Sequence, residues 1–328
     1  CARDHATPAG PVEGSDSAPW SHGARCGQVV AQGQSRRLLW QNRPVSSILS
    51  IQSHVAYGYV GNSAAVFPLQ RRGDEVWPVL TVNFSNHTGY GAWRGPLIEA
   101  DQVRDVVRGI DERGVLDRAD AVLTGYQGSA DMGAAILDIV DLVRQRNPQA
   151  IYCCDPVMGD VDRGFYCLPG IPEFMRDQVV PRADVMTPNL FELEFLTGRQ
   201  TSAIDEVVQA AHALRERGPR TVLVTSVSAP GSAADVMRMV AVTDEGAWQV
   251  ETPMISQVFT GSGDVTSAIF LSSLLRSGSA AEALGATASV VYSLLRTTAD
   301  TGSSELALVQ AQSQLVEPRW TFEAQRLS

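Results

Sequence analysis

Residues 261–270 read GSGDVTSAIF, a sequence that predicts a glycine-rich turn followed at once by a helix. The first turn of a helix leaves main-chain N–H groups unpaired, and these groups can bind phosphate oxygens. Glycine also allows a positive φ and a close approach of the main chain to a ligand. Asp264 would then hold a carboxylate beside the anion site, which indicates transfer of a phosphoryl group to an alcohol. An ordinary turn is the alternative for this motif taken alone.

The composition limits the class of protein. The chain has 328 residues, of which 44% are hydrophobic and 19% charged, and these values are typical of a soluble globular protein. Its length suits one large α/β domain or two small ones. A net charge of −10 argues against nucleic acid as the main partner. No apolar run reaches the length of a membrane span, so we expect no membrane partner.

The absence of lysine and the spacing of the cysteines limit the possible chemistry. All 26 residues counted as Lys or Arg are arginine, so a Schiff-base lysine and the lysine of a Walker loop are both excluded. The five cysteines show no zinc-like spacing, and their odd number argues against a disulfide framework. A reducing, cytoplasmic location fits this cysteine content best.

Residues 1–46 differ from the rest of the chain. They are rich in Gly, Pro, Ser, Gln and Arg and lack apolar periodicity, which predicts a disordered or extraneous tail. The first methionine is Met132, so we interpret the tail as a reading-frame extension, with Val45 as the product of an alternative start codon. A secretory signal is the rival interpretation, but an apolar core segment is missing. Residues 47–328 are expected to form one domain.

From residue 47 onward, short apolar runs alternate with amphipathic stretches. This alternation predicts an α/β protein with a mainly parallel central sheet and helices on both faces. The strands are expected at 48–51, 76–82, 121–124, 150–154, 185–186 and 221–225, with a hairpin at 236–242 and 248–252. The helices are expected at 61–70, 102–111, 131–146, 190–197, 204–217, 263–276, 280–297 and 304–314.

Polar residues follow several of these expected strands. Because ligands of open α/β sheets bind beyond the carboxyl ends of the strands, their convergence predicts a ligand site at one rim. Helix capping by polar loop residues is the alternative. The segments concerned are 53–54, 83–88, 125–129, 155–160 and 187–189.

Acidic residues in these segments suggest a cation. Asp155 follows a buried strand and suits a hydrated cation, or a phosphate held through one. Asn189 and Glu192 lie three positions apart, so they share one helical face. Either they hold Mg²⁺ through water, or Asn189 is simply a helix cap.

Histidines and tyrosines in these segments allow two interpretations each. His54 and His87 could orient a substrate, or they could be hydrogen-bonded structural residues. Tyr57 and Tyr126 could stack on an aromatic ring, or they could fill the core.

These motifs, in this order, resemble the pyridoxal kinases of the ribokinase superfamily, especially the bacterial pyridoxamine/pyridoxal kinase type. The resemblance covers about residues 48–322 and leaves the tail without a counterpart. It implies a ribokinase-like three-layer α/β/α fold. The segments that carry it are SIQSHVAYGYVGNSAAVFPLQ (50–70), TVNFSNHTGYG (81–91), GYQGS (125–129), CDPVMGD (154–160), TPNLFELEFLTG (187–198) and GSGDVTSA (261–268).

The resemblance implies ATP-dependent phosphorylation of the 5′-hydroxymethyl group of pyridoxal, or of a close vitamer, to give pyridoxal 5′-phosphate. By position, Asp264 is expected to be the general base, and the amides of Gly261, Ser262 and Gly263 the anion hole. Family members use Mg²⁺, often a monovalent cation such as K⁺, and are usually homodimers. Matching positions assign Ser53, His54, Thr88, Gly89 and Tyr126 to the vitamer, Asp155, Glu192, Thr225, Thr252, Pro253, Met254 and Ile255 to ATP, and Asp155, Asn189 and Glu192 to the metal.

Two positions depart from the family pattern. Thr225 stands where these bacterial kinases often carry Lys, and Gly89 stands where a Gln commonly follows Thr88. The preferred vitamer and the turnover therefore stay open. A hydroxymethylpyrimidine or sugar kinase of the same superfamily, or a vitamer-binding protein without catalysis, are the alternatives.

Overall fold

The computed structural model describes residues 45–227 and 235–327. Contacts divide the chain into two units, Cys1–Arg43 and Pro44–Ser328, and all described residues belong to the second unit. The predicted tail therefore lies outside the described residues, except for its last two positions. Within the described part of the chain, no helix combines the length and the hydropathy that a membrane span requires.

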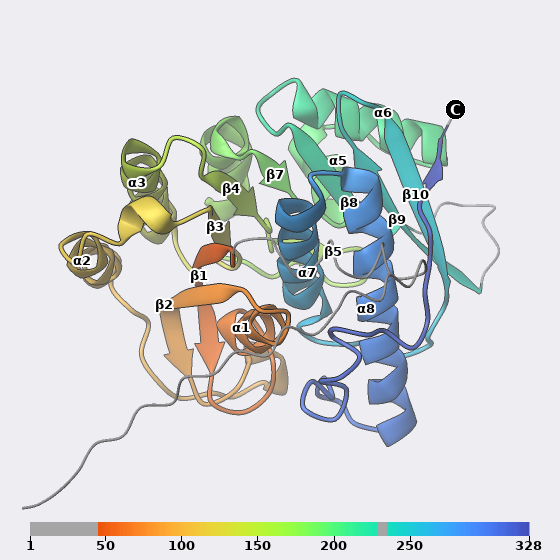
Figure 1. Cartoon of the computed structure of the whole chain (residues 1–328), viewed down its shortest axis with the longest axis horizontal. Helices are drawn as coiled ribbons and strands as arrows, with labels where there is room; N and C mark the ends of the chain where they lie inside the picture. Colours follow the sequence, from red (N-terminus) through yellow and green to blue (C-terminus); the bar gives the residue numbers. More distant parts are fainter. Residues whose placement is uncertain (1–44, 228–234, 328) are drawn as a thin grey trace, which may run out of the picture. The chain divides into compact units, whose positions relative to one another are not determined.

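A single large sheet forms the centre of this unit. Its strands are β1 (Ser47–Val55), β2 (Glu75–Phe84), β3 (Ala121–Thr124), β4 (Ile151–Cys154), β7 (Val185–Met186), β8 (Thr221–Val227), β9 (Val236–Val242), β10 (Ala247–Pro253) and β11 (Gln325–Arg326). The parallel part has the order β2-β1-β3-β4-β7-β8, and β9, β10 and β11 extend it as antiparallel strands (Figure 1). A small separate ribbon pairs β5 (Gly159–Asp160) with β6 (Gly164–Phe165).

The parallel strands are apolar on both faces. Ile48 and Leu49 are both fully buried, but they belong to different core clusters on opposite faces of the sheet. Val122 and Leu123 of β3 are divided between the same two clusters. Such strands read as continuous apolar runs because helices must cover both faces of a parallel sheet.

Helices supply those two covering layers. The helices are α1 (Asn62–Arg71), α2 (Ala100–Asp111), α3 (Ala130–Arg146), α4 (Ile171–Phe174), α5 (Leu190–Thr197), α6 (Ile204–Arg215), α7 (Ser262–Ser277) and α8 (Ala280–Thr301). One cluster packs α2, α3, α5 and α6 on the first face, and the other packs α1, α7 and α8 on the second (Figure 1). The expected three-layer α/β/α fold is confirmed.

The order of strands reverses at β1, because β2 lies on one side of it and β3 on the other. It passes from β1 through α1 to β2 at the edge of the sheet, and from β2 through α2 to β3 on the other side of β1. Ligands of open α/β sheets bind at such a reversal, beyond the carboxyl ends of the strands. The ends of β1 and β3, at Val55 and Thr124, therefore mark a place where a site is expected.

The helix predicted for residues 304–314 is wrong. Gly302 adopts a left-handed φ of 65° and ends α8, and a bend at residues 304–305 and turns at residues 308–316 follow. Ser303 and Glu305 bond to each other through the serine hydroxyl, which competes with helical hydrogen bonds. Leu306 and Leu308 are buried against α7 and α8, so their apolar pattern anchors a loop and does not mark a helix.

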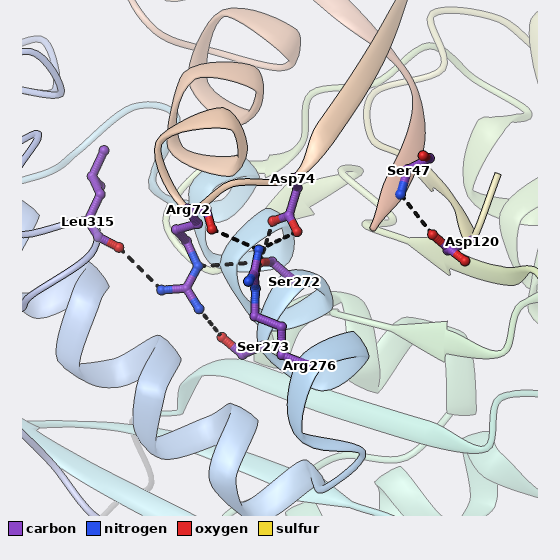
Figure 2. A network of polar contacts seen from close by, with 8 residues as sticks. All are labelled: Ser47, Arg72, Asp74, Asp120, Ser272, Ser273, Arg276 and Leu315. Atoms are coloured by element: carbon purple, nitrogen blue, oxygen red, sulfur yellow. Dashed lines mark hydrogen bonds and ion pairs between the residues drawn. The ribbon is translucent and has the colours of Figure 1, made fainter. Parts of the chain in front are cut away.

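A polar network fixes α7 to the turn that follows α1 (Figure 2). Arg72 donates hydrogen bonds to Ser272 and Ser273 of α7, over 3.3 and 3.0 Å. Arg276 of α7 pairs with Asp74, whose side chain is fully buried. Ser272 also donates to Asp74 over 2.6 Å. The network therefore joins the C-terminal half of α7 to the loop between α1 and β2.

Candidate active site

The glycine-rich turn opens α7, as the sequence predicts. Gly261 has a left-handed φ of 84°, and Ser262 is the first residue of the helix. A Cβ atom on Gly261 would lie 1.8 Å from the carbonyl oxygen of Tyr59, so no other residue fits without a shift of the main chain. Asp264 lies in the first turn of α7.

The amides of this turn differ in their availability. The amide of Ser262 donates to the carbonyl of Phe259 over a long 3.3 Å. For the amides of Gly261 and Gly263, no hydrogen-bond acceptor is found among residues 45–227 and 235–327. The start of a helix also carries a partial positive charge. Two amides beside Asp264 are therefore available to an anion, while the third already has a partner.

The carboxyl group of Asp264 lies where β1 and β3 end. The amide of Gly61, which precedes α1, donates to this carboxylate, and burial raises the pKa of Asp264 to about 6. Gly125 follows β3, and a Cβ atom there would lie 3.5 Å from Asp264 Oδ1 and 2.6 Å from Gln52 Oε1. A carboxylate with a pKa just below neutrality suits a general base.

A second carboxylate, that of Asp155, lies near Asp264. Asp155, at the end of β4, accepts hydrogen bonds from the hydroxyl of Ser267, over 2.9 Å, and from the amide of Val157. Burial raises the pKa of Asp155 well above its ordinary value, and the charges of Glu192 and Asp264 raise it further. Val157 has a φ of 28°, which is rare for a β-branched residue and indicates main-chain strain at this site.

Glu192 and Asn189 form the capping box of α5. The carboxylate of Glu192 accepts from the amides of Met158, over 2.7 Å, and Asn189, over 2.9 Å, while burial raises its pKa. The Asn189 side chain accepts from the Glu192 amide and donates to the carbonyl of Gly159. The side-chain oxygen and nitrogen of Asn189 therefore both have hydrogen-bond partners. This residue is a helix cap in the structure.

These carboxylates suit a cation held partly through water. Among the described residues, no group of three or more His, Cys, Asp or Glu side chains is placed to hold a metal ion directly. Mg²⁺ commonly keeps several waters and binds one or two carboxylates together with substrate phosphates. Asp155 and Glu192 fit that mode, because burial and then the charge of Glu192 raise the pKa of Asp155, and a cation would offset these effects.

A cavity of about 220 Å³ adjoins the start of α7 and lies between strands and α8. Its lining includes Ser262 and all five residues that were assigned to ATP outside the acidic cluster. Those five are Thr225, Thr252, Pro253, Met254 and Ile255. The cavity is next to Asn189, because Thr225 forms a main-chain bridge with that residue.

Sequence reasoning missed much of the wall of this cavity. The added residues come from β8, β9, the loop before α7, α7 itself and α8: Ser226, Met237, Met239, Gln257, Phe259, Thr266, Ala288, Val291, Tyr292 and Leu295. Two sequence signals for these lining residues were available. Met237 and Met239 alternate along a strand, and Val291 and Leu295 lie one helical turn apart. Neither pattern can be told from ordinary core packing in sequence alone.

The residues assigned to the vitamer do not all lie together in the structure. Ser53 lies against α1, and a Cβ atom on Gly61 would come within 2.3 Å of its hydroxyl. His54 Nδ1 lies 3.0 Å from the Ser63 hydroxyl, so its ring has a structural contact. Tyr126 follows β3 and is partly buried.

Thr88 and Gly89 lie in an exposed turn after β2, in the short 3₁₀ helix Thr88–Tyr90. No direct contact joins this turn to Asp264 among the interactions of the described residues. The turn contacts the ring of Tyr57 and also Glu305, which sequence reasoning missed and which accepts a hydrogen bond from Tyr90.

Comparison with known proteins agrees with this geometry. The sequence model of the phosphomethylpyrimidine kinase family matches residues 104–308, more than half of the chain. The pyridoxal kinase of Corynebacterium diphtheriae is 52% identical over 282 residues, covering 86% of this chain and 100% of the relative. That of Leifsonia xyli subsp. xyli is 54% identical over 280 residues, covering 85% and 99%.

Solved structures give the same assignment. Pyridoxal kinase from Leishmania donovani in complex with ADP and pyridoxamine superimposes with a TM-score of 0.81. It is 29% identical in sequence and covers 86% of this chain and 100% of its own. The chain belongs to the pyridoxal kinase family, whose fold is ribokinase-like.

Proposed function

We propose that this protein transfers the γ-phosphoryl group of ATP to the 5′-hydroxymethyl group of pyridoxal, which gives pyridoxal 5′-phosphate and ADP in vitamin B6 salvage. The supporting observation is a buried carboxylate in the first turn of α7, beside two available amides and a cavity. Relatives more than 50% identical along nearly their whole length carry the name pyridoxal kinase.

Asp264 acts as the general base in this proposal. Its pKa of about 6 leaves the carboxylate ionised at neutral pH, so it can accept the proton of the 5′-hydroxyl as that oxygen attacks the γ-phosphorus. The bond from the γ-phosphorus to the bridging oxygen breaks, and ADP leaves with the electron pair. The amides of Gly261 and Gly263 stabilise the charge on the transferred group.

The cavity beside α7 takes the nucleotide. Met237, Met239 and Leu295 offer apolar surfaces to an aromatic base, and Ser262 places the start of α7 at one end of the cavity. Thr225 replaces the charge of a lysine with a hydroxyl at the edge of this cavity. The ADP found in the Leishmania donovani enzyme supports ATP as the co-substrate.

Mg²⁺ is proposed as the cofactor, held by Asp155 and Glu192 through water. When bound, it offsets negative charge on the phosphates. Asn189 contributes by orienting Glu192. K⁺ activation and a homodimer stay predictions of the resemblance, and a cytoplasmic location stays a prediction from the cysteine content. Comparison of rates in NaCl and KCl tests K⁺ activation, and sedimentation tests the dimer. Fractionation of cells tests the location. Residues 47–328 are proposed as one catalytic domain.

A vitamer panel tests the function. Purified protein with ATP and Mg²⁺ is expected to phosphorylate pyridoxal, and product formation is followed at the absorbance of the phosphorylated aldehyde. Hydroxymethylpyrimidine belongs in the panel because the matching sequence model bears the name phosphomethylpyrimidine kinase. Faster turnover of hydroxymethylpyrimidine than of pyridoxal would favour the alternative function, a hydroxymethylpyrimidine kinase. Tight pyridoxal binding without phosphate transfer would favour a vitamer-binding protein.

A further inference from the structure

Glu305 connects two loops that precede it in the sequence by more than 200 residues. Its Oε1 atom accepts a hydrogen bond from the hydroxyl of Tyr90 over 2.7 Å and lies 3.2 Å from Nε2 of His87. Its Oε2 atom accepts from the main-chain amide of Tyr59 over 3.0 Å. One carboxylate therefore binds the turn after β2 with one oxygen and the loop between β1 and α1 with the other.

Both loops lead to the proposed active site. His87 and Tyr90 flank the two turn residues assigned to the vitamer. Tyr59 leads to Gly61, whose amide donates to the carboxylate of Asp264. The carbonyl of Tyr59 also packs against the glycine-rich turn, where a Cβ atom on Gly261 would lie 1.8 Å away. Glu305 thus contacts the backbone that positions the base as well as the turn expected over the vitamer.

The position of Glu305 is closely defined. Its side chain is 11% exposed, and a carboxylate so far removed from water requires hydrogen-bond donors. Within the described part of the chain, His87 is its ion-pair partner, and no arginine is paired with it. Gly58 has a φ of 89°, and a Cβ atom there would lie 2.6 Å from Glu305 Oε2. The glycine leaves the space that this carboxylate occupies.

We propose that Glu305 is a positioning residue for the vitamer. Its carboxylate holds the turn at residues 87–90 and the loop at residues 58–61 in a fixed relation, so that the vitamer pocket has both of its walls. This inference rests on the proposed function, since it assigns the two loops to that pocket. The nucleotide cavity is lined by neither loop, so ATP binding is not expected to depend on Glu305.

The test compares Glu305→Ala, Glu305→Gln and Tyr90→Phe with the unmodified protein. Loss of several hydrogen bonds in Glu305→Ala is expected to raise the KM for pyridoxal by about tenfold or more, with the KM for ATP changed by less than about twofold. Glu305→Gln keeps an acceptor, and Tyr90→Phe removes one bond, so each is expected to raise the pyridoxal KM by only about threefold. Amide hydrogen exchange is expected to speed up at residues 58–61 and 87–91, but not in α7.

Glu317→Ala is the matched control, because Glu317 is exposed in the same C-terminal segment. It is expected to leave both KM values and the exchange rates unchanged. Equal increases in both KM values for Glu305→Ala, together with a lower melting temperature, would show a general structural role and overturn the inference. Unchanged pyridoxal KM in Glu305→Ala would also overturn it. If Glu305→Ala does not fold, a pyridoxal KM unchanged in both Glu305→Gln and Tyr90→Phe overturns it.

Failure of the proposed function gives a different result. In that case the unmodified protein and Glu317→Ala would both lack phosphorylation of pyridoxal. Pyridoxal affinity, measured by calorimetry on each variant, and the exchange rates still report on the two loops. Equal pyridoxal affinity and equal exchange in the unmodified protein and Glu305→Ala would then overturn the role of Glu305.

Discussion

The main-chain amide of Gly61 donates a hydrogen bond to the carboxylate of Asp264, which joins the start of α1 to the start of α7. These two residues lie about 200 positions apart in the sequence. The bond favours the ionised carboxylate, as does the main-chain amide of Asp264 itself, and both oppose burial, which is the largest influence on its pKa. The result is a base that is poised close to neutrality.

Asp264→Asn should remove most of the activity. The amide keeps the size of the side chain but cannot accept a proton, so kcat is expected to fall by about 10²–10⁴-fold, with the KM for ATP nearly unchanged. Asp131→Asn is the control, because Asp131 is an exposed acidic residue in the first turn of α3. Steady-state kinetics measures both variants. A loss of less than about tenfold in Asp264→Asn would mean that another group or solvent accepts the proton.

The activity should depend on pH through Asp264. Its pKa is raised to about 6, so the carboxylate is protonated and inactive as a base below that pH and ionised above it. We expect kcat/KM for pyridoxal to rise with pH through about 6 and to level off above about 7. The profile is measured in buffers of constant ionic strength. An acid limb that persists unchanged in the residual activity of Asp264→Asn would assign it to a different group.

Gly125→Ala should impair the reaction by steric contact. The added methyl group would lie 2.6 Å from Gln52 Oε1, so the Gln52 side chain must move, and 3.5 Å from Asp264 Oδ1, which is an ordinary van der Waals distance. Because the methyl group would fill the space beside the Asp264 carboxylate, we expect kcat/KM to fall by at least about tenfold.

Gly109→Ala is the control for this substitution. Gly109 lies inside α2, and a Cβ atom there meets nothing within 4 Å. Alanine should therefore leave the kinetics unchanged and stabilise the protein by about 0.5–1 kcal/mol. Equal kinetics for Gly125→Ala and the unmodified protein would show that the space at Gly125 is not needed.

Glu192→Gln should raise the Mg²⁺ concentration needed for half-maximal rate. The carboxylate accepts from the amides of Met158 and Asn189, and a neutral side chain would weaken both bonds and remove charge from the proposed metal site. A several-fold increase in this Mg²⁺ concentration is expected, because the substitution removes a negative charge beside the proposed metal site. Titration of the rate with Mg²⁺ at saturating ATP measures it, and an unchanged curve would exclude Glu192 from the metal site. Glu206→Gln, at an exposed position near the start of α6, is the control.

Gln127→Leu should stabilise the protein without changing its kinetics. Gln127 is 2% exposed, and both its amide nitrogen and its oxygen lack a hydrogen-bond partner among the described residues. Replacing an unsatisfied buried amide by an apolar group of similar shape should raise the free energy of unfolding by about 1–2 kcal/mol. Urea unfolding measures the change, with Gln149→Leu at an exposed position as the control. A lower stability of Gln127→Leu would show that the amide has a partner, such as a bound water.

The sequence predicted the bounds of the regular elements best where local signals mark both ends. The strands at 121–124 and 185–186 and the helix at 190–197 have the predicted bounds, because apolar runs or a cap and a glycine delimit them. The helix predicted at 304–314 failed because side chains bury against other helices at a spacing that local propensity cannot foresee. Ser262, assigned to the anion hole, has its amide bound within the turn.

The sequence by itself determined the alternating α/β pattern, the glycine-rich turn and the identity of Asp264 as the candidate base, because each depends on neighbouring residues. Only the tertiary structure decided that Gly61, Gly125 and Asp264 meet, and that Glu305 binds two remote loops. Such contacts depend on which strands are neighbours in the sheet and on how α7 and the C-terminal segment pack, and chain order alone does not specify either.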